Sequence, residues 1–353
     1  MLVTKQPTLR RFWYPVMPIG HLAGGPKPFR LLGTDIVLWL TSDGTPAAIA
    51  DRCCHRTAKL SRGYCEDGRI VCGYHGWQYD RNGMVIRVPQ AAGTGDQRTA
   101  LRTPAYNTAA RYGYVWVALD DPLTAIPEFE EAVTPGFRKI DQFYDVWACA
   151  GLRLMENSFD MAHIAFVHRA TFGDSESPKP AGFRITRTDD GFIMDSEVQV
   201  VNRALQKEIL GMTEDTTTRI AQAQWYMPFV RKTKISYPTG LVHSIVTAAT
   251  PIDDKASQIV QFCFRNDSES DTSTADVIRF DFAIVEEDKY ILEGTDHDVP
   301  LEPRGIEASM ASDKPGLILR EMLRDLLARH GEAEATGHRP NVGNVSPSIS
   351  RET

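Results

Sequence analysis

Residues 53–55 read Cys-Cys-His and, after sixteen further residues, residues 72–75 read Cys-Gly-Tyr-His. Each of these short segments offers one cysteine and one histidine, and the chain between them is long enough for a β-hairpin that brings the two segments together. Two thiolates and two imidazoles presented in this way form a set of metal ligands. The sequence therefore predicts a metal centre bound by Cys53, His55, Cys72 and His75.

The spacing of these ligands distinguishes two kinds of centre. The order C-x-H and then C-x2-H indicates a Rieske [2Fe–2S] centre, in which two histidines replace two cysteines on one of the two irons. A zinc site is the alternative, because zinc accepts the same four ligands. Zinc sites usually pair the cysteines in one segment and the histidines in the other, so the spacing favours the cluster. Cys54 adds a second thiol to the first segment, and the spacing selects Cys53 as the ligand.

Composition indicates a protein with two globular domains. The chain has 353 residues, of which 42% are hydrophobic and 24% charged. The net charge of −7 gives no basic field and argues against nucleic acid or an anionic membrane surface as a partner. No apolar run approaches the roughly 20 residues of a membrane span, and residues 1–11 lack the apolar core of a secretory signal. We therefore expect a cytoplasmic protein whose six cysteines are reduced thiols or ligands.

The N-terminal third has the pattern of short antiparallel strands separated by Gly, Pro and Asp-Gly turns. The apolar, partly β-branched runs are residues 12–16, 36–40, 47–50 and 112–119. The tryptophans of this region are interpreted as core residues: Trp13, Trp39, Trp77 and Trp116. Asp-Asp-Pro at 120–122 ends the pattern. We expect a β domain over residues 1–120 and a linker over residues 121–147.

The surroundings of the two ligand segments, residues 53–63 and 72–80, resemble the Rieske domain of the Rieske non-haem iron oxygenases. Cys54 and Gly73 stand where that family often has proline, and the strand predicted at 112–119 also resembles the family. The resemblance implies an α+β protein. Its N-terminal antiparallel β Rieske [2Fe–2S] domain is followed by a helix-grip catalytic domain, an antiparallel sheet folded over a long helix.

A second group of chemically active residues lies at 155–168. If this stretch is one helix, Asn157, Asp160, His163 and His168 fall within an arc of about 140°. A single buried histidine is ordinarily a hydrogen-bonded core residue, but two histidines with two polar neighbours indicate a site. The D-x2-H-x4-H order resembles the mononuclear iron motif of the same oxygenases. That resemblance implies that His163 and His168 bind iron, that Asp160 links this iron to the Rieske cluster of a neighbouring subunit, and that Asn157 is the family's nearby helix asparagine.

The third iron ligand has to come from farther along the chain, because a 2-His-1-carboxylate triad needs an acid and leaves positions open for O2 and substrate. Strand patterns between 183 and 265 predict a second antiparallel sheet, and a helix is expected at about 275–292. Asp288 lies within the apolar stripe of this helix, where an acid needs a partner or a metal. The segment around Asp288 also resembles the family's carboxylate segment. The alternative is a helix-edge acid paired with Arg279 or Lys289.

The C-terminal part begins with a helix start at 312–315, where proline is tolerated in the first turn. We expect the catalytic domain to span residues 148–330, with mononuclear Fe(II) bound in it. Residues 331–353 are polar and aperiodic and are predicted to form a flexible tail. Aromatic and apolar residues at 225–229 and Ile291 suit either a flat substrate pocket or the core.

The resemblance covers roughly residues 10–330 and implies the terminal oxygenase of a multicomponent system. Such a protein takes electrons from a reductase or ferredoxin and uses O2 to hydroxylate, or to remove O- or N-methyl groups from, a small aromatic or heterocyclic molecule. The single-chain form resembles the monooxygenase branch, and the family likeness also implies a homotrimer. Ring cis-dihydroxylation is an alternative reaction. A Rieske-type electron carrier and a zinc-stabilised binding protein are the non-enzymatic alternatives.

Overall fold

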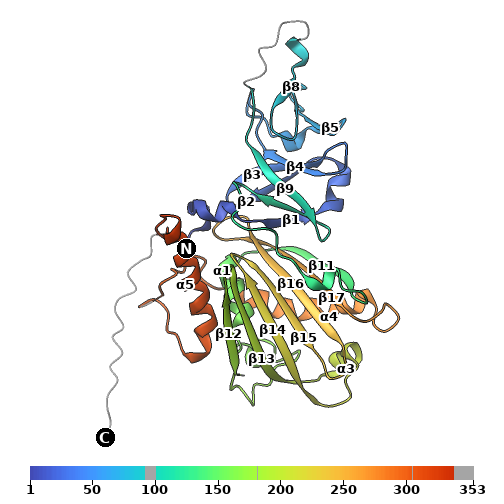
Figure 1. Ribbon diagram of the computed structural model, residues 1–353, viewed down its shortest axis with the longest axis vertical. Helices are drawn as coiled ribbons and strands as arrows, with labels where there is room; N and C mark the ends of the chain where they lie inside the picture. The colour runs from blue at the N-terminus through green and yellow to red at the C-terminus, as the bar shows by residue number, and fades with distance from the viewer. Residues whose placement is uncertain (92–100, 181, 304, 338–353) are drawn as a thin grey trace.

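The computed structural model describes residues 1–91, 101–180, 182–303 and 305–337. Two β-rich bodies lie one above the other, with the N-terminal residues forming the upper body in Figure 1 and residues from β11 onward forming the lower one. This arrangement confirms the predicted α+β fold with an N-terminal antiparallel β domain. No helix in the described part of the chain is long and apolar enough to cross a membrane.

The upper body contains a six-stranded and a four-stranded antiparallel sheet. The first has the order β1-β10-β9-β4-β3-β2, and the second has the order β5-β6-β7-β8. The strands are β1 Tyr14–Pro18, β2 Lys27–Leu31, β3 Thr34–Leu40, β4 Pro46–Ala50, β5 Tyr64–Glu66, β6 Arg69–Val71, β7 Gln78–Tyr79, β8 Val85–Arg87, β9 Ala105–Arg111 and β10 Tyr114–Ala118. Trp39 and Trp116 are fully buried, as predicted for core residues.

The lower body is a seven-stranded antiparallel sheet with the order β11-β17-β16-β15-β14-β13-β12. Its strands are β11 Arg138–Trp147, β12 Phe183–Thr188, β13 Gly191–Val201, β14 Thr216–Tyr226, β15 Val230–Ser236, β16 Val242–Pro251 and β17 Ser257–Arg265. The α-helices are α1 Gly151–Phe159, α2 Ile164–Val167, α3 Ala204–Leu210, α4 Thr274–Leu292 and α5 Lys314–Arg329. Helix α4 begins at Ser273, whose hydroxyl accepts the N–H of Asp276, and crosses the sheet face as predicted.

The predicted linker is partly a strand, because β11 lies within residues 121–147 and pairs along its length with β17. A register shift between Asp141 and Phe143 places an extra residue in this strand. Such a bulge breaks the alternation of period two that sequence patterns depend on. The edge of the catalytic sheet therefore begins about ten residues earlier than expected.

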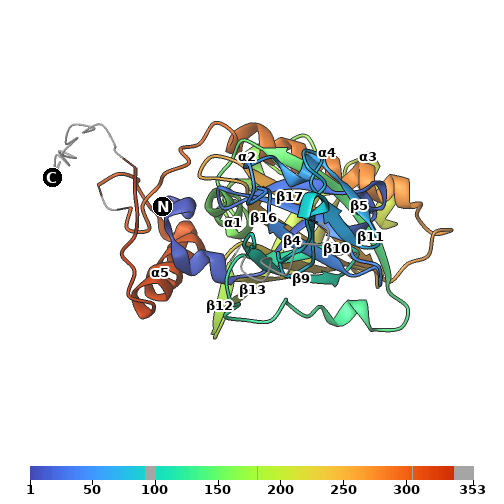
Figure 2. The same ribbon diagram turned by 90° about the horizontal axis from the view of Figure 1, so that it is seen from above.

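The N-terminal residues lie beside α5 on one side of the molecule, next to the segment that follows this helix (Figures 1 and 2). The N-terminal ammonium group donates to the carbonyl oxygen of Val299 at 2.5 Å, and Thr8 donates to Glu332 at 2.6 Å. The backbone N–H of Leu2 donates to Ala335 at 2.7 Å. The first residues of the predicted Rieske domain thus pack on the catalytic part. Glu332 and Ala335 of the predicted flexible tail make two of these bonds, and residues 338–353 of the tail lie outside the described residues.

Candidate metal centres and substrate cavity

The four predicted cluster ligands lie on two loops, one after β4 and one between β6 and β7. The thiol-bearing residues Cys53 and Cys72 are 2% and 1% exposed, whereas His55 is exposed and His75 is partly exposed, with ring centres 4.6 Å apart. Burial raises the pKa of the Cys72 thiol, and the neighbouring Cys53 contributes to this rise. Two thiols inside and two imidazoles outside suit the two unequal irons of a Rieske cluster. Cys54 is exposed, so Cys53 is the better placed thiol.

Two aromatic residues contact the candidate ligands, and the sequence analysis had interpreted one of them, Trp77, as a core residue. Trp77 stacks on His55 with ring centres 4.5 Å apart and an interplanar angle of 1°. The Tyr79 hydroxyl lies 3.1 Å from the Cys53 sulfur and accepts the backbone N–H of Cys54 at 3.1 Å. Tyr79 comes from β7, directly after the second ligand segment. In the sequence, the order C-x2-H-x-W-x-Y at residues 72–79 was the signal that could have indicated that Trp77 and Tyr79 contact the ligands.

The stretch that carries the second group is not the single helix that we predicted. Helix α1 ends at Phe159, and the Asp160 carboxylate accepts the N–H of Ala162 at 2.7 Å. This local bond competes with helix continuation, as aspartate side chains often do. His163 and His168 then flank the single turn α2. Breaking the helix lets both imidazoles turn toward the same point.

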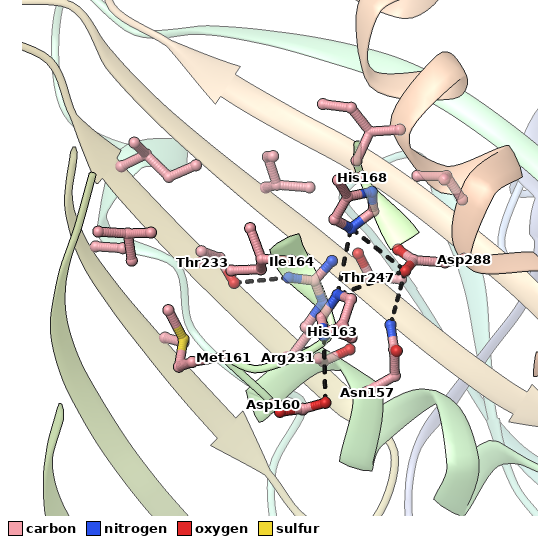
Figure 3. Close-up of a pocket in the computed structure, with 18 of the residues that line it drawn as sticks. Asn157, Asp160, Met161, His163, Ile164, His168, Arg231, Thr233, Thr247 and Asp288 are labelled. Atoms are coloured by element: carbon pink, nitrogen blue, oxygen red, sulfur yellow. Dashed lines mark hydrogen bonds and ion pairs between the residues drawn. The ribbon is translucent and has the colours of Figure 1, made fainter. Parts of the chain in front are cut away.

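Three predicted iron ligands converge there (Figure 3). The Nε2 atoms of His163 and His168 are 3.2 Å apart, and they lie 3.6 and 3.4 Å from Asp288 Oδ1. With metal–nitrogen bonds of about 2.1 Å, adjacent ligand atoms in an octahedral site are about 3 Å apart. These side chains therefore fit one ion of a 2-His-1-carboxylate site with open positions.

The alternative partners of Asp288 are engaged elsewhere. Arg279 pairs with Asp276 at 3.0 Å, and Lys289 pairs with Asp145 at 2.6 Å. Asp288 instead accepts a hydrogen bond from the Asn157 side chain at 3.0 Å. Asn157 therefore orients the carboxylate that we assign to iron.

Glu287 holds the second histidine, a role that the sequence analysis missed. Its carboxylate lies 2.9 Å from His168 Nδ1 and accepts the Thr171 hydroxyl at 2.7 Å. An Nδ1–H donated to a carboxylate leaves Nε2 free for a metal and fixes the ring. Burial lowers the pKa of His168 to about 4, which keeps its imidazole neutral, the form that binds metal. The only sequence signal was an acid directly before Asp288.

A mostly apolar cavity of about 180 Å³ opens beside the triad, between the sheet face and helices α1 and α4 (Figure 3). Arg219 and Arg231 contribute its basic groups, and Asp160 and Asp288 its acidic ones. Its apolar lining includes Met161, Ile164, Phe172, Met194, Val198, Ala221, Ala223, Ile235, Ile245, Ile259, Ile284 and Val285. The run at 225–229, which suited either pocket or core, lies in the core clusters instead.

Comparison with known proteins agrees with this geometry. The family model described as "Rieske [2Fe-2S] domain" matches residues 12–106, and "Vanillate O-demethylase oxygenase C-terminal domain" matches residues 147–329. Methylxanthine N1-demethylase NdmA of Pseudomonas putida is 30% identical over 92% of this chain and 91% of its own length. A solved structure of NdmA with caffeine has a TM-score of 0.80, at 26% identity over 92% of this chain and 93% of that one.

Two further relatives extend the comparison. Methylxanthine N3-demethylase NdmB, also from Pseudomonas putida, is 27% identical over 90% of this chain and 89% of its own length. The dicamba O-demethylase oxygenase component of Stenotrophomonas maltophilia is 31% identical over 46% of this chain and 48% of its own length. Each of these relatives is named as a demethylase.

The catalytic family model covers more than half of the chain, and NdmA matches nearly all of it, so family membership is established. Membership gives the cofactors as a [2Fe–2S] cluster and non-haem iron, and it contradicts the readings as a zinc protein or a lone electron carrier. The protein is an enzyme that takes electrons from a reductase or ferredoxin. The chain belongs to the Rieske non-haem iron oxygenases, as a monooxygenase component of the demethylase branch.

Proposed function

We propose that this oxygenase removes a methyl group from oxygen or nitrogen of a small aromatic or heterocyclic molecule. One atom of O2 enters the methyl group, two electrons and two protons reduce the other to water, and the hydroxylated methyl leaves as formaldehyde. The observation that carries this proposal is the convergence of His163, His168 and Asp288 at the wall of an apolar cavity. When bound, the cluster stores one electron and the iron activates O2.

The chain's own residues provide the positions for this chemistry. We assign Cys53, His55, Cys72 and His75 to the cluster. The two ends of α2 supply His163 and His168, α4 supplies Asp288, and the apolar lining of the cavity excludes water from them. The Asn157 amide orients Asp288 while leaving the open side of the triad facing the cavity. A methyl group held against that side is the group that reacts.

We infer that electrons reach the iron from the cluster of a neighbouring subunit in a homotrimer. Within one chain, the cluster loops lie in the upper body and the triad lies in the lower one (Figure 1). Asp160 Oδ2 is 3.5 Å from His163 Nδ1, and the Asp160 side chain keeps 32% of its surface exposed. An acid that touches an iron ligand and also reaches the surface suits a link between subunits. We place this assembly in the cytoplasm.

The Asp160→Asn variant tests this link. We expect both metal sites to fill, because Asp160 is not a ligand, while oxidation of the reduced cluster by O2 in a single turnover becomes at least 100-fold slower. Cluster absorbance in a stopped-flow experiment measures the rate, and analytical ultracentrifugation measures the assembly. Normal cluster oxidation in Asp160→Asn, or a monomeric active enzyme, would contradict the proposed route.

Metal analysis and product analysis test the function itself. Anaerobically purified protein supplied with ferrous iron is expected to hold about three irons and two acid-labile sulfides per chain. His163→Ala should lose one iron and all formaldehyde release from methoxybenzoate and N-methylated heterocycle probes, while the visible cluster spectrum stays. His330→Ala, an exposed position, is the control. A cis-diol instead of formaldehyde would identify ring dihydroxylation, and formaldehyde release that survives in His163→Ala would refute the site.

A further inference from the structure

Two arginines that line the cavity lack an acidic partner among the described residues. Arg219 on β14 is 7% exposed, and its Nε and Nη2 atoms are buried without a hydrogen-bond acceptor. Arg231 on β15 also has a buried Nε atom without a hydrogen-bond acceptor, and its Nη1 donates to the Thr233 hydroxyl at 2.7 Å. Both side chains therefore carry positive charge and free donors at the cavity wall.

This charge is costly unless something in the cavity compensates it. A guanidinium group stays protonated in proteins, so burial cannot be relieved by loss of the proton. Burying an unpaired charge is among the most unfavourable events in a folded protein. The acids in the lining, Asp160 and Asp288, contact the iron histidines, and Asp288 and Asp281 act on the Arg231 charge through space without an ion pair to it. Ferrous iron bound at the triad adds positive charge, so the loaded cavity has an excess of it.

Strand register places Arg231 in a row of polar side chains. Arg231 on β15 is directly opposite Thr247 on β16, and Thr247 is opposite Gln261 on β17. Directly opposite side chains lie on the same sheet face about 5 Å apart. The Thr247 hydroxyl donates to the side-chain oxygen of Gln261 at 2.7 Å, and this bond holds the two side chains in place. Figure 3 shows Arg231, Thr233 and Thr247 around the triad.

Arg219 occupies a different part of the cavity wall. Its guanidinium lies over the Phe172 ring, 4.5 Å from the ring centre. Arg231 pairs with Trp225, which is six residues from Arg219 along β14, or about 20 Å between backbones at 3.4 Å per residue. Figure 3 shows Arg231 beside His163 of the triad, so Arg231 is the candidate for direct contact with a substrate at the iron, while Arg219 adds positive potential.

We propose that the substrate of this oxygenase is an aromatic or heteroaromatic acid whose carboxylate binds Arg231. This inference rests on the proposed demethylase function and specifies its substrate class. A planar carboxylate matches the guanidinium donors and compensates the buried charge. A neutral heterocycle offers acceptors but leaves that charge in place. The apolar lining then contacts the ring and holds its methyl group at the iron.

Equilibrium binding of benzoate and benzamide tests the proposal. The two probes have nearly the same shape and differ in charge. With anaerobic enzyme loaded with cluster and ferrous iron, calorimetry should show benzoate binding about 10- to 100-fold more tightly than benzamide, as expected for a charge-assisted contact. Arg231→Met should remove this preference and leave benzamide binding unchanged, and Arg231→Lys should keep part of it. Arg184→Met removes an exposed arginine of β12 and is the matched control.

Three results would overturn the proposal. Equal binding of the two probes by the unmodified enzyme would exclude an anion site, and this comparison needs no variant to fold. A benzoate preference that survives in Arg231→Met would place the carboxylate elsewhere, for example on the iron. A preference lost in Arg219→Met but kept in Arg231→Met would assign the contact to Arg219. Binding is measured without O2, so benzoate binding without formaldehyde release from methoxybenzoates would contradict only the proposed demethylation.

Discussion

Two of the acids on helix α4, Asp281 and Asp288, lie two helical turns apart and each lies beside an amide and an imidazole. Asp288 is contacted by the Asn157 amide and by two histidines. Asp281 accepts a bond from the Gln142 amide and lies 3.1 Å from His243 Nε2. Each of these two carboxylates of α4 therefore lies beside an amide and an imidazole that come from other parts of the chain.

The two acids differ in whether their surroundings open onto the cavity. Asp288 faces the cavity with its ligand atom shared by His163 and His168. Asp281 is 2% exposed and belongs to a fully buried group with His243 and Cys263. Burial raises the pKa of the Cys263 thiol well above its usual value, which favours its protonated form in the metal-free protein. The triad around Asp288 therefore opens onto a cavity that can hold a substrate, whereas the group around Asp281 lines no part of that cavity.

A chain of hydrogen bonds accounts for the buried acid. The Gln142 amide that donates to Asp281 also accepts from Gln261 at 3.0 Å, and Gln261 accepts from Thr247 at 2.7 Å. Buried polar groups of this kind contribute stability when each member has a partner. We therefore interpret Asp281 as a structural residue that supports the cavity wall at Gln261 and Thr247.

Exchanging each acid for its amide gives the largest expected difference. Asp288→Asn should lower product formation at least 100-fold and weaken binding of the mononuclear iron, because an amide supplies no negative ligand. Asp281→Asn should keep iron at the level of the unmodified enzyme. Iron and sulfide analysis after loading, together with formaldehyde release, measures both variants. Loss of one iron in Asp281→Asn would show that the buried group is a metal site and remove the distinction drawn here.

Truncation of the same two acids to alanine should have the larger effect on stability at Asp281, whereas the effect on activity is larger at Asp288. Asp281→Ala removes the acceptor of the Gln142 amide and the only carboxylate paired with the buried His243 among the described residues, which we expect to cost about 3 kcal/mol of unfolding free energy. Asp288→Ala should cost less in the metal-free protein, because its neighbours line a cavity. Urea unfolding of metal-free protein, followed by tryptophan fluorescence, gives the comparison. Equal losses in the two variants would argue against a structural role specific to Asp281.

The sequence predicted Asp288 but not the contrast with Asp281. Local ligand spacing identified the cluster residues, and the D-x2-H-x4-H order identified the histidines, because these signals depend only on nearby residues. The apolar stripe on α4 gave no information about the partners of Asp281, because these come from the distant strands β11 and β16. The sequence analysis missed β11 as a strand, because a bulge interrupts its alternation. The strand β15, which carries Arg231, was also not predicted.

The cavity arises only when strands and helices are brought together, and no pattern along the chain indicates it. Hydrophobic periodicity also does not indicate the break of the helix at Asp160. The break is caused by a hydrogen bond from the backbone N–H of Ala162 to the Asp160 side chain. Hydrophobic periodicity records which residues face a core. It does not record which buried arginines lack a partner, and Arg219 and Arg231 became informative only once their contacts were known.

Glu287, the neighbour of Asp288, should show an intermediate effect. Glu287→Gln replaces a charged acceptor of the His168 Nδ1 proton with a weaker one. We expect iron affinity to fall about 10- to 100-fold, in line with residues that orient metal ligands. Titration with ferrous iron, followed by restored activity, measures the affinity. Glu286→Gln, on the same helix and outside the cavity lining, is the control, and an unchanged affinity in Glu287→Gln would remove Glu287 from the site.

Asp35 extends the comparison to an exposed acid and should show the smallest effect. Hydrogen bonds from Arg30 and Lys59, each 2.7 Å long, lower the pKa of Asp35 to about 2. Because the folded value lies below the unfolded one, the stabilisation is complete above about pH 4 and is lost as the pH falls toward 2. The side chain is 38% exposed, so solvent screening limits the loss in Asp35→Asn to below about 1 kcal/mol at pH 7. Urea unfolding of the metal-free variant and unmodified protein at pH 7 and pH 3 should show this difference shrinking, and a difference that grows with acidity would contradict the assignment.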